Sequence, residues 1–537
     1  MTSDSIFDCG PDDGESPAGG DWRRDLALIA LPALALFAVC LVDQPMFADG
    51  DSNWHVAAGR WILAHRAVPL VDPFSYTALG RPWVAHEWLS EVLMALAWRA
   101  AGWSGVMVLI AAAAATSLAL VTAELRRSLG TLSVIVALSL GAMVLAPHLL
   151  ARPHVLALPL LVLWTGQLLK ARRRERAPPL WLLPVMTVWA NLHGSFIFGL
   201  AFTAFFALEA FLAARGPAPA PAPLDRSGGR ALSARRRVGG FLSRQARPFL
   251  APAALAVAAK WGAFLIAASA MALITPNGLT GLTYPLHVMS MKYLDAIGEW
   301  RPARFKQLTA LEVAVFFTLF VCLYRGVRMG AARLGLILVL LYMTFQHIRQ
   351  EVILMTVGPL LLAEPLGRAL APARANPRRA IDWPPFAKLA APAAVAVLLF
   401  ALPAAWRLAT PDERTDRFAV PVTALAHVPA VLRAKPVFND YSFGGWLVFN
   451  GVRPFMDGRS DMYGDDLLKL YLDVERADPA AVARTFSRYD IQWTILSPRS
   501  PLVKRLDATA GWRRLYADKW AVVQVREDTP TAPAGAR

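Results

Sequence analysis

Two acidic residues flank a glycine a few positions after the first long apolar segment of the chain. They are Asp49 and Asp51, and the apolar run before them extends from Leu26 to Val42. Two carboxylates so placed can bind a divalent cation such as Mg2+ or Mn2+, or one can take a proton from an incoming hydroxyl group. The alternative is that acids occupy this helix end because it lies in water. We treat both as candidate catalytic residues and candidate metal ligands.

The stretch after the acidic pair adds groups able to bind a polar substrate. Its tryptophans are typical of a membrane–water interface, although indole rings also stack against sugars. They are Trp54, Trp61, Trp83 and Trp88. A later polar segment, NLHGS at 191–195, contributes two further residues. The candidate substrate-binding residues are His55, His86, Glu87, Asn191 and His193.

Basic side chains lie at two other junctions between apolar segments. Cations in such surroundings are candidates for binding an anionic phosphate, and arginine does so through paired donors. For each one taken alone, the alternative is that the side chain extends toward lipid headgroups. The candidate phosphate-binding residues are Arg152, His154, His347 and Arg349.

The elements that must position these side chains are membrane helices. The chain has 537 residues, of which 56% are hydrophobic and 18% charged. Its formal charge of +16 comes from arginines between apolar runs, a pattern that the excess of Lys and Arg in cytoplasmic loops explains. Without a recognition motif, this charge does not indicate nucleic acid as a partner. The three cysteines provide no disulfide or zinc framework.

We predict an all-α polytopic membrane bundle of eleven helices, because each apolar run is long enough, or nearly so, to cross a hydrocarbon core of about 30 Å. Residues 180–213 are split at Asn191 into two spans; one long helix there would invert the sidedness of everything downstream. The predicted spans are 26–42, 103–123, 131–147, 154–170, 180–192, 196–213, 250–272, 308–325, 334–348, 351–369 and 386–406.

Charge indicates which side of the membrane each loop occupies. Arg23 and Arg24 precede the first span, which places the N-terminus in the cytoplasm and the acidic pair outside. Alternation then places nearly every arginine cluster inside, and the polar segments join the acidic pair outside. We therefore expect a multi-pass protein of the inner membrane with a periplasmic C-terminus. Val84 to Arg99 has apolar residues at helical spacing and is predicted to lie at the interface.

The domain boundaries follow from these assignments. We predict a disordered cytoplasmic tail, two membrane bundles separated by a basic cytoplasmic linker, a small periplasmic α/β domain and a disordered tail. The corresponding residues are 1–21, 22–213 with a periplasmic loop at 43–102, 214–248 for the linker, 249–406, 407–528 and 529–537.

The α/β domain offers a second candidate site. Strands are predicted at 435–439, 453–457, 491–497 and 520–526, and helices at 465–476, 480–489 and 502–508. Polar residues after two of the strands would form a crevice if the strands are parallel; Asx-turn and helix-cap chemistry is the alternative. The candidate acceptor-binding residues are Asn439, Asp440, Asp457, Arg459 and Asp461.

Several motifs together resemble bacterial polytopic membrane proteins related to the GT-C glycosyltransferases. They are DGDSNWHVAAGRWI (49–62), VPLVDPFSYTALGRPWVAHEWL (68–89), WANLHGSF (189–196), TPNG (275–278), GEW (298–300), NDYSFGGWL (439–447) and MDGRSDMYG (456–464). The resemblance implies an acidic first outer loop, an interfacial helix after it, and an outer C-terminal domain. It also implies sugar transfer from a polyprenyl-phosphate carrier, with the family's acid matching Asp49 or Asp51. Asn53 departs from the pattern, which usually has an aromatic residue there.

The leading hypothesis is an inverting glycosyltransferase at the periplasmic face. Asp49 or Asp51 would act on the acceptor hydroxyl, while Arg152, His154 and Arg349 would stabilise the departing polyprenyl phosphate. The acceptor would be a lipid, a glycan or a protein. A polysaccharide polymerase or ligase is a near variant. A transporter of lipid or solute is the rival from another class, but transporters tend to show internal repeats, and none is evident. A non-catalytic assembly scaffold would not need the acids.

Overall fold

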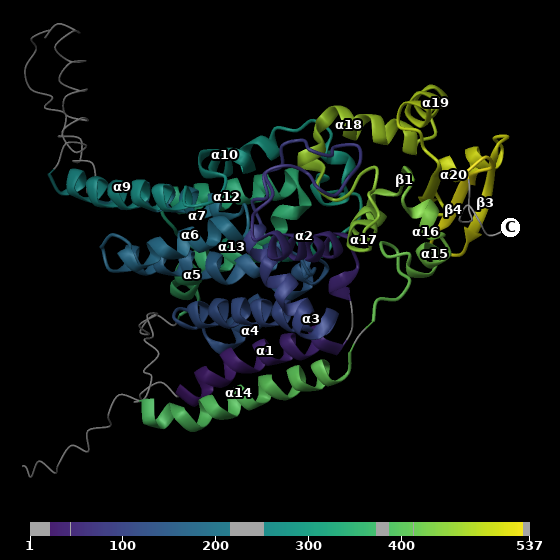
Figure 1. Cartoon of the computed structure of the whole chain (residues 1–537). Coiled ribbons are helices and arrows are strands. Elements are labelled where there is room, and N and C mark those ends of the chain that lie inside the picture. The colour runs from purple at the N-terminus through teal and green to yellow at the C-terminus, as the bar shows by residue number, and fades with distance from the viewer. Residues whose placement is uncertain (1–21, 43–44, 215–251, 372–385, 412, 530–537) are drawn as a thin grey trace, which may run out of the picture.

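The computed structural model describes residues 22–42, 45–214, 252–371, 386–411 and 413–529 (Figure 1). The predicted tails at 1–21 and 529–537 and the basic linker at 214–248 lie outside this part of the chain, apart from residues 214 and 529. Within it, the protein is a bundle of membrane helices with a small α/β domain at one end (Figure 1).

Eight helices are long and apolar enough to cross a membrane, judged by length and composition among the described residues. Their bounds are α1 (Trp22–Val42), α3 (Trp88–Arg126), α4 (Thr131–Leu145, continued by a 3-10 turn to His148), α5 (Pro153–Arg173), α7 (Phe196–Ala214), α9 (Pro252–Ala272), α13 (Glu351–Leu370) and α14 (Phe386–Ala409). Three shorter apolar helices are α6 (Leu183–Leu192), α11 (Ala310–Tyr324) and α12 (Ala331–Gln346). Every predicted span thus contains a helix, while the number of crossings stays a prediction.

The division of residues 180–213 into two helices is confirmed. α6 ends at Leu192 and α7 begins at Phe196, and His193 between them has an extended backbone. The break places a polar turn at the same end of the bundle as residues 45–87, which are predicted to lie outside and are called the first outer loop below.

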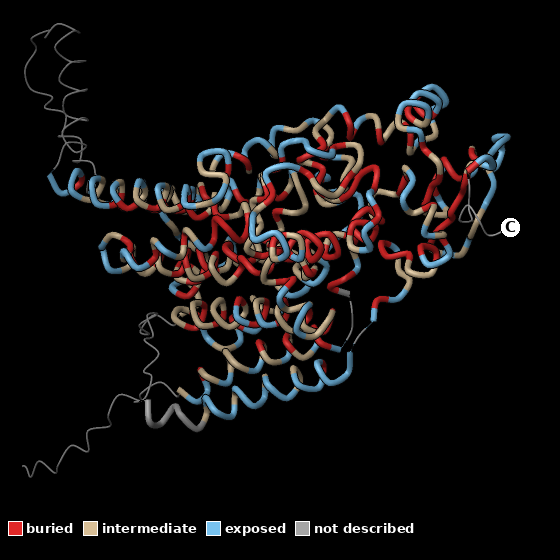
Figure 2. Tube along the Cα trace, in the orientation of Figure 1, coloured by how far each residue is buried: buried red, intermediate tan, exposed pale blue. Residues whose placement is uncertain are grey.

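The helices α1 and α14 form one edge of the bundle (Figure 1). α1 and α14 lie side by side although they are far apart in the sequence, and Phe37 contacts Phe400 with ring centroids 5.2 Å apart (Figure 1). The described side chains of α14 are mostly exposed (Figure 2). Because these residues are apolar, exposure on the outside of a membrane bundle fits contact with lipid tails.

The charged residues of the bundle are concentrated at its two ends. At one end, Arg126 pairs with Asp25, and Glu209 accepts from Arg172 at 3.2 Å and pairs with Arg333 at 3.1 Å. This is the end where sequence charge predicts the cytoplasm. The other end carries the outer loops and the α/β domain. The structure therefore has the predicted polar asymmetry, and its orientation in the cell stays a prediction.

The first outer loop contains one more helix than the sequence analysis identified. α2 (Asp51–His65) packs against the start of α3, and a Cβ atom at Gly59 would overlap the backbone carbonyl of Glu91. Only glycine permits this approach, which brings both helices into one layer. The predicted interfacial segment begins at Trp88 instead of Val84, and it joins the following span through a break at Ala101 and Gly102.

The α/β domain has a four-stranded sheet in the order β1-β2-β4-β3. β1 (Val437–Asn439) is parallel to β2 (Trp493–Leu496), whereas β4 (Val522–Arg526) is antiparallel to β2 and to β3 (Trp512–Ala517). Its helices are α15 (Val422–Ala426), α16 (Ala430–Arg433), α17 (Gly444–Phe449), α18 (Ser460–Glu475), α19 (Pro479–Arg488) and α20 (Pro501–Asp507). The predicted strand at 453–457 is wrong, and β3 was not predicted. Residues 453–457 do not pair with the sheet because the Asn439 side chain accepts from the Phe455 N–H at 2.8 Å.

A buried ion cluster attaches the first outer loop to this domain. Arg459 donates to Asp72 at 2.7 Å and to Asp457 at 2.6 Å, and its guanidinium lies over the rings of Phe74 and Trp83. All three charged side chains are at most 1% exposed. Because an unpaired buried charge is costly, this contact determines how the loop and the domain meet.

Replacing this arginine tests its contribution to stability. Arg459→Met leaves two carboxylates buried without their cation, so we expect the free energy of unfolding to fall by about 3–5 kcal/mol. Arg514→Met is the matched control, since the Arg514–Asp507 pair is surface-exposed and should change stability by about 1 kcal/mol or less. Thermal unfolding in one detergent compares them. Equal effects would contradict a structural role for the buried cluster.

Candidate active site

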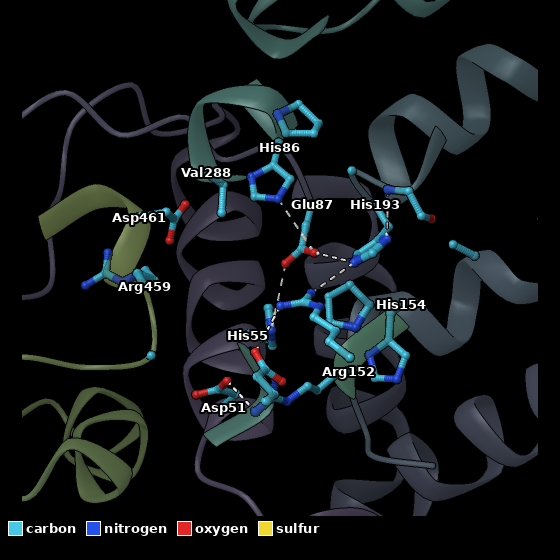
Figure 3. A pocket seen from close by; sticks show the side chains of 18 of the residues that line it. Asp51, His55, His86, Glu87, Arg152, His154, His193, Val288, Arg459 and Asp461 are labelled. Atoms are coloured by element: carbon cyan, nitrogen blue, oxygen red, sulfur yellow. Dashed lines mark hydrogen bonds and ion pairs between the residues drawn. The ribbon is translucent and has the colours of Figure 1, made fainter. Parts of the chain in front are cut away.

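A cavity of about 210 Å³ lies where the first outer loop, the ends of several membrane helices and the α/β domain meet (Figure 3). Its wall combines residues distant in sequence: Asp51 and His55 from α2, Arg152 beside α5, Arg349 before α13, and Asp461 from α18. The acids and cations predicted separately from the sequence therefore share one space.

Arg152 is the centre of the charged part of this cavity. It is the residue immediately before α5, and its side chain is 14% exposed. Its Nε donates to Asp49, its Nη2 lies 2.7 Å from an Asp51 oxygen, and its Nη1 donates to Glu299 at 2.6 Å. One guanidinium thus pairs with three carboxylates, two at the start of α2 and one from the distant turn Gly298–Trp300.

The structure distinguishes the two acids of the sequence motif. Asp51 lines the cavity, whereas Asp49 does not, and the Oδ1 atom of Asp49 is buried without a hydrogen-bond partner. Burial raises the pKa of Asp51 to about 7, against the opposing effect of Arg152 and with support from Asp49. A carboxyl with a pKa near neutral can gain and lose a proton under cellular conditions, as a general base must.

The α/β domain approaches Asp51 closely. A Cβ atom at Gly458 would overlap the Oδ1 atom of Asp51. The domain backbone can therefore lie against the carboxylate only because residue 458 is glycine. The position of Asp51 depends on how the domain docks.

Arg349 is the second cation of the cavity, and Glu299 joins it to Arg152. Arg349 Nη1 donates to Glu299 at 2.9 Å, and the guanidinium lies 5.1 Å from the ring centre of Trp300. Burial alone would raise the pKa of Glu299, but Arg152 and Arg349 outweigh it and lower the pKa to about 2. Sequence analysis gave Glu299 no role, although the GEW motif contains it.

A carboxyl–histidine cluster forms the neighbouring part of the cavity. Glu87 lies 3.3 Å from His193, 3.7 Å from His86 and 3.9 Å from His55, measured to each Nε2 atom (Figure 3). Burial raises the pKa of Glu87 and lowers the pKa values of His55 and His193. Neutral imidazoles around a carboxyl group can accept and donate protons, so this cluster suits the binding of a hydroxyl group.

The other predicted residues of the membrane part lie in different positions. His154 lines the cavity, and its Nε2 donates to the His148 carbonyl at 3.0 Å. His347 and Asn191 do not line it. His347 donates to the Trp300 carbonyl at 2.7 Å, and Asn191 accepts from Trp88 at 2.7 Å. Both therefore hold cavity segments in place and do not face a ligand.

The predicted acceptor crevice at the strand ends requires correction. Asn439 and Asp457 are fully buried, and Asp440 accepts from the Ser442 N–H as a cap. Arg459 reaches the cavity wall but is engaged by Asp72 and Asp457. Burial removes these side chains from ligands, and the cap alternative describes Asp440. Asp461, which was predicted with them, does line the cavity, and so does Tyr441, to which the sequence analysis gave no role.

The arrangement does not fit a divalent cation between Asp49 and Asp51. The guanidinium of Arg152 binds both carboxylates and occupies the position that a bridging metal would need. Among the residues the structure describes, no group of three or more His, Cys, Asp or Glu side chains could hold a metal ion. We therefore derive no step through a metal.

Comparison with known proteins gives matches in structure. No protein-family model and no curated sequence matches the chain. The apo oligosaccharyltransferase of Archaeoglobus fulgidus is similar over 87% of this chain and 69% of that one, with 12% identity and a TM-score of 0.49. ArnT from Cupriavidus metallidurans bound to undecaprenyl phosphate is similar over 93% of this chain and 97% of that one, with 13% identity and a TM-score of 0.43. Both are GT-C proteins. At this level of similarity, a function for this chain has to be argued from its own site.

The raised pKa of Asp51 predicts a pH-dependent stability difference. The folded parent keeps a proton on Asp51 up to a pH of about 7, whereas the unfolded chain releases it near an ordinary pKa of about 4. Its unfolding free energy should therefore fall as pH rises between these values. Asp51→Asn has no such proton, so its stability relative to the parent should rise from about pH 5 to about pH 8 in thermal unfolding.

Asp507→Asn is the control for this measurement. Arg514 lowers the pKa of the largely exposed Asp507, so that carboxyl is ionised in both states over the same pH range. The unfolding free energy of Asp507→Asn relative to the parent should therefore not change with pH. If the relative unfolding free energy of Asp51→Asn does not change with pH either, the Asp51 carboxyl has an ordinary pKa.

Proposed function

We propose that this protein is an integral-membrane glycosyltransferase that moves a sugar from a polyprenyl-phosphate carrier to an acceptor hydroxyl. The reaction takes place at the periplasmic face of the inner membrane. The observation that carries the proposal is the presence of Asp51, with a pKa of about 7, beside Arg152 and Arg349 in one cavity at the outer-loop end of the bundle. A proton acceptor next to two guanidiniums suits attack at a carbon whose leaving group is a phosphate.

In the proposed reaction, the acceptor oxygen attacks the anomeric carbon of the donor sugar. A carbon–oxygen bond to the acceptor forms as the bond to the phosphate oxygen breaks, and its electron pair leaves with the polyprenyl phosphate. Asp51 takes the proton of the acceptor hydroxyl. Arg152 and Arg349 stabilise the negative charge that develops on the phosphate. Attack from the face opposite the phosphate inverts the anomeric centre.

The two acids of the first outer loop have different roles in this proposal. Asp51 faces the cavity and is assigned as the base. Asp49 binds Arg152 through Nε and positions it. Glu87 and its histidines lie beside the base and are assigned to binding the acceptor hydroxyl. Asp461 and Tyr441 face the same space from the α/β domain, which supports acceptor recognition by that domain.

The proposed orientation follows from charge. Among the described residues, the end of the bundle opposite the cavity carries arginines of the predicted cytoplasmic loops, including Arg172, Arg173 and Arg333. The excess of basic residues in cytoplasmic loops supports this assignment. The cavity would then open to the periplasm, where lipid, glycan or protein acceptors are available.

Substitution of each acid tests the proposed base. Asp51→Asn should reduce sugar transfer by about 100- to 10,000-fold, the usual contribution of a general base, whereas Asp49→Asn should cause a smaller loss. Mass spectrometry of envelope glycans in a deletion strain would identify the missing sugar, and complementation would rank the variants. Full activity of an expressed and inserted Asp51→Asn protein would exclude Asp51 as the base.

Metal removal provides a separate test. Because Arg152 occupies the space between Asp49 and Asp51, we expect transfer to continue in excess chelator and to gain nothing from added Mg2+ or Mn2+. Purified protein and the identified lipid-linked sugar would be used. Activity that is lost with chelator and restored by Mn2+ would mean that a cation displaces Arg152 from the acids.

A further inference from the structure

Glu299 binds both arginines of the cavity at once. Its Oε2 atom accepts from Arg152 Nη1 at 2.6 Å, and its Oε1 atom accepts from Arg349 Nη1 at 2.9 Å. Each oxygen of one anion thus pairs with a different guanidinium. Two oxygens of a phosphate group would bind the same two arginines in the same way.

The charges around Arg152 leave little room for another anion. All three of its nitrogens are engaged, by Asp49, Asp51 and Glu299. These three carboxyl groups face the two positive charges of Arg152 and Arg349. These contacts use three of the five N–H groups of Arg152. A phosphate that bridges Arg152 and Arg349 needs the position between their Nη1 atoms, which the Glu299 carboxylate occupies. Glu299 therefore has to leave before a phosphate can bridge both arginines.

Among the three acids, Glu299 is the easiest to move. Its side chain is 29% exposed, compared with 19% for Asp49 and 20% for Asp51. It belongs to the three-residue 3-10 turn Gly298–Trp300, and a Cβ atom at Gly298 would meet no atom within 4 Å. Asp51, in contrast, begins a helix and lies against the backbone of Gly458.

Trp300 anchors the turn that carries Glu299. The indole is 9% exposed and lies beneath the Arg349 guanidinium, and His347 donates to the Trp300 carbonyl. The anchor of the turn is therefore the residue next to the acid. Displacement of Glu299 requires a side-chain movement and leaves the packed parts of the site unchanged.

We propose that Glu299 occupies the place of the donor's phosphate between Arg152 and Arg349, and that the donor binds by displacing it. The inference rests on the proposed function. It makes Glu299 a specificity-determining residue, because only a ligand whose anionic group bridges both guanidiniums compensates for the lost ion pairs. A neutral polyprenyl alcohol lacks that group and leaves Glu299 where it is.

Binding of undecaprenyl phosphate to the purified full-length chain tests this proposal. Glu299→Gln removes the competing charge with little change in shape, and we expect the dissociation constant to fall about tenfold or more, which corresponds to about 1.4 kcal/mol. Glu299→Ala should change it in the same direction. Binding of undecaprenol should be unaffected by either substitution.

Glu351→Gln is the matched control. Glu351 is another carboxylate at this end of the bundle. Unlike Glu299, which pairs with two arginines, it pairs with His148 at 3.0 Å. Its substitution should leave the affinity for undecaprenyl phosphate unchanged. Thermal unfolding of each variant shows that the fold is retained.

The outcomes separate the inference from the proposed function. If the parent binds undecaprenyl phosphate and both Glu299 variants bind it equally or more weakly, then Glu299 is not a competitor and the inference is overturned, while the proposed function stands. If folded parent and variants all fail to bind the lipid phosphate, the proposed function itself is overturned, together with the inference.

Discussion

The pairing of Arg152 with Asp49, Asp51 and Glu299 is the interaction on which the site depends. A charged side chain in a poorly solvated region is stable only when it is paired and hydrogen-bonded. Arg152 lies before α5, the two aspartates lie at the start of α2, and Glu299 lies between α10 (Gly278–Met289) and α11. Because these buried charges must be paired with one another, three distant parts of the chain meet at one end of the bundle.

Poor solvation also divides the cavity into two chemical parts. Where guanidiniums are present, Glu299 stays ionised and its pKa falls to about 2. Where imidazoles replace them, burial dominates and the pKa of Glu87 rises. The pKa of Asp51 rises to about 7 because burial outweighs the opposing effect of Arg152. A carboxyl that can exchange its proton near neutral pH thus lies beside an anion-binding region and a region that favours neutral polar groups, as the proposed transfer from a phosphate to a hydroxyl would require.

The α/β domain forms part of the cavity wall. Gly458 lies against Asp51, and Tyr284 on α10 donates to Asp461 of the domain at 2.6 Å. The Arg459 cluster fixes the same domain to the first outer loop through Asp72. Because the domain contributes part of the cavity wall, the cavity is complete only when the domain is docked.

The sequence by itself determined the features that depend on local pattern. Each predicted apolar span contains a helix of the structure, and the Arg clusters predicted a polar asymmetry between the two ends. Position at the borders of apolar runs also singled out Asp49, Asp51, Arg152 and Arg349 as candidates, without deciding between the two acids. The split near Asn191 was found in the same way, because polar residues interrupt the run there.

Only the tertiary structure decided which of these charges meet. Glu299 was not assigned a role because an acid in a polar loop has no distinguishing local pattern, and its importance comes from two arginines far away in the sequence. The strand predicted at 453–457 is a loop because the side chain of Asn439 satisfies its backbone. Asp457 and Arg459 are a buried pair instead of an open crevice. Which charges pair and which side chains are buried depends on contacts between residues far apart in the sequence, and a local sequence pattern does not contain these contacts.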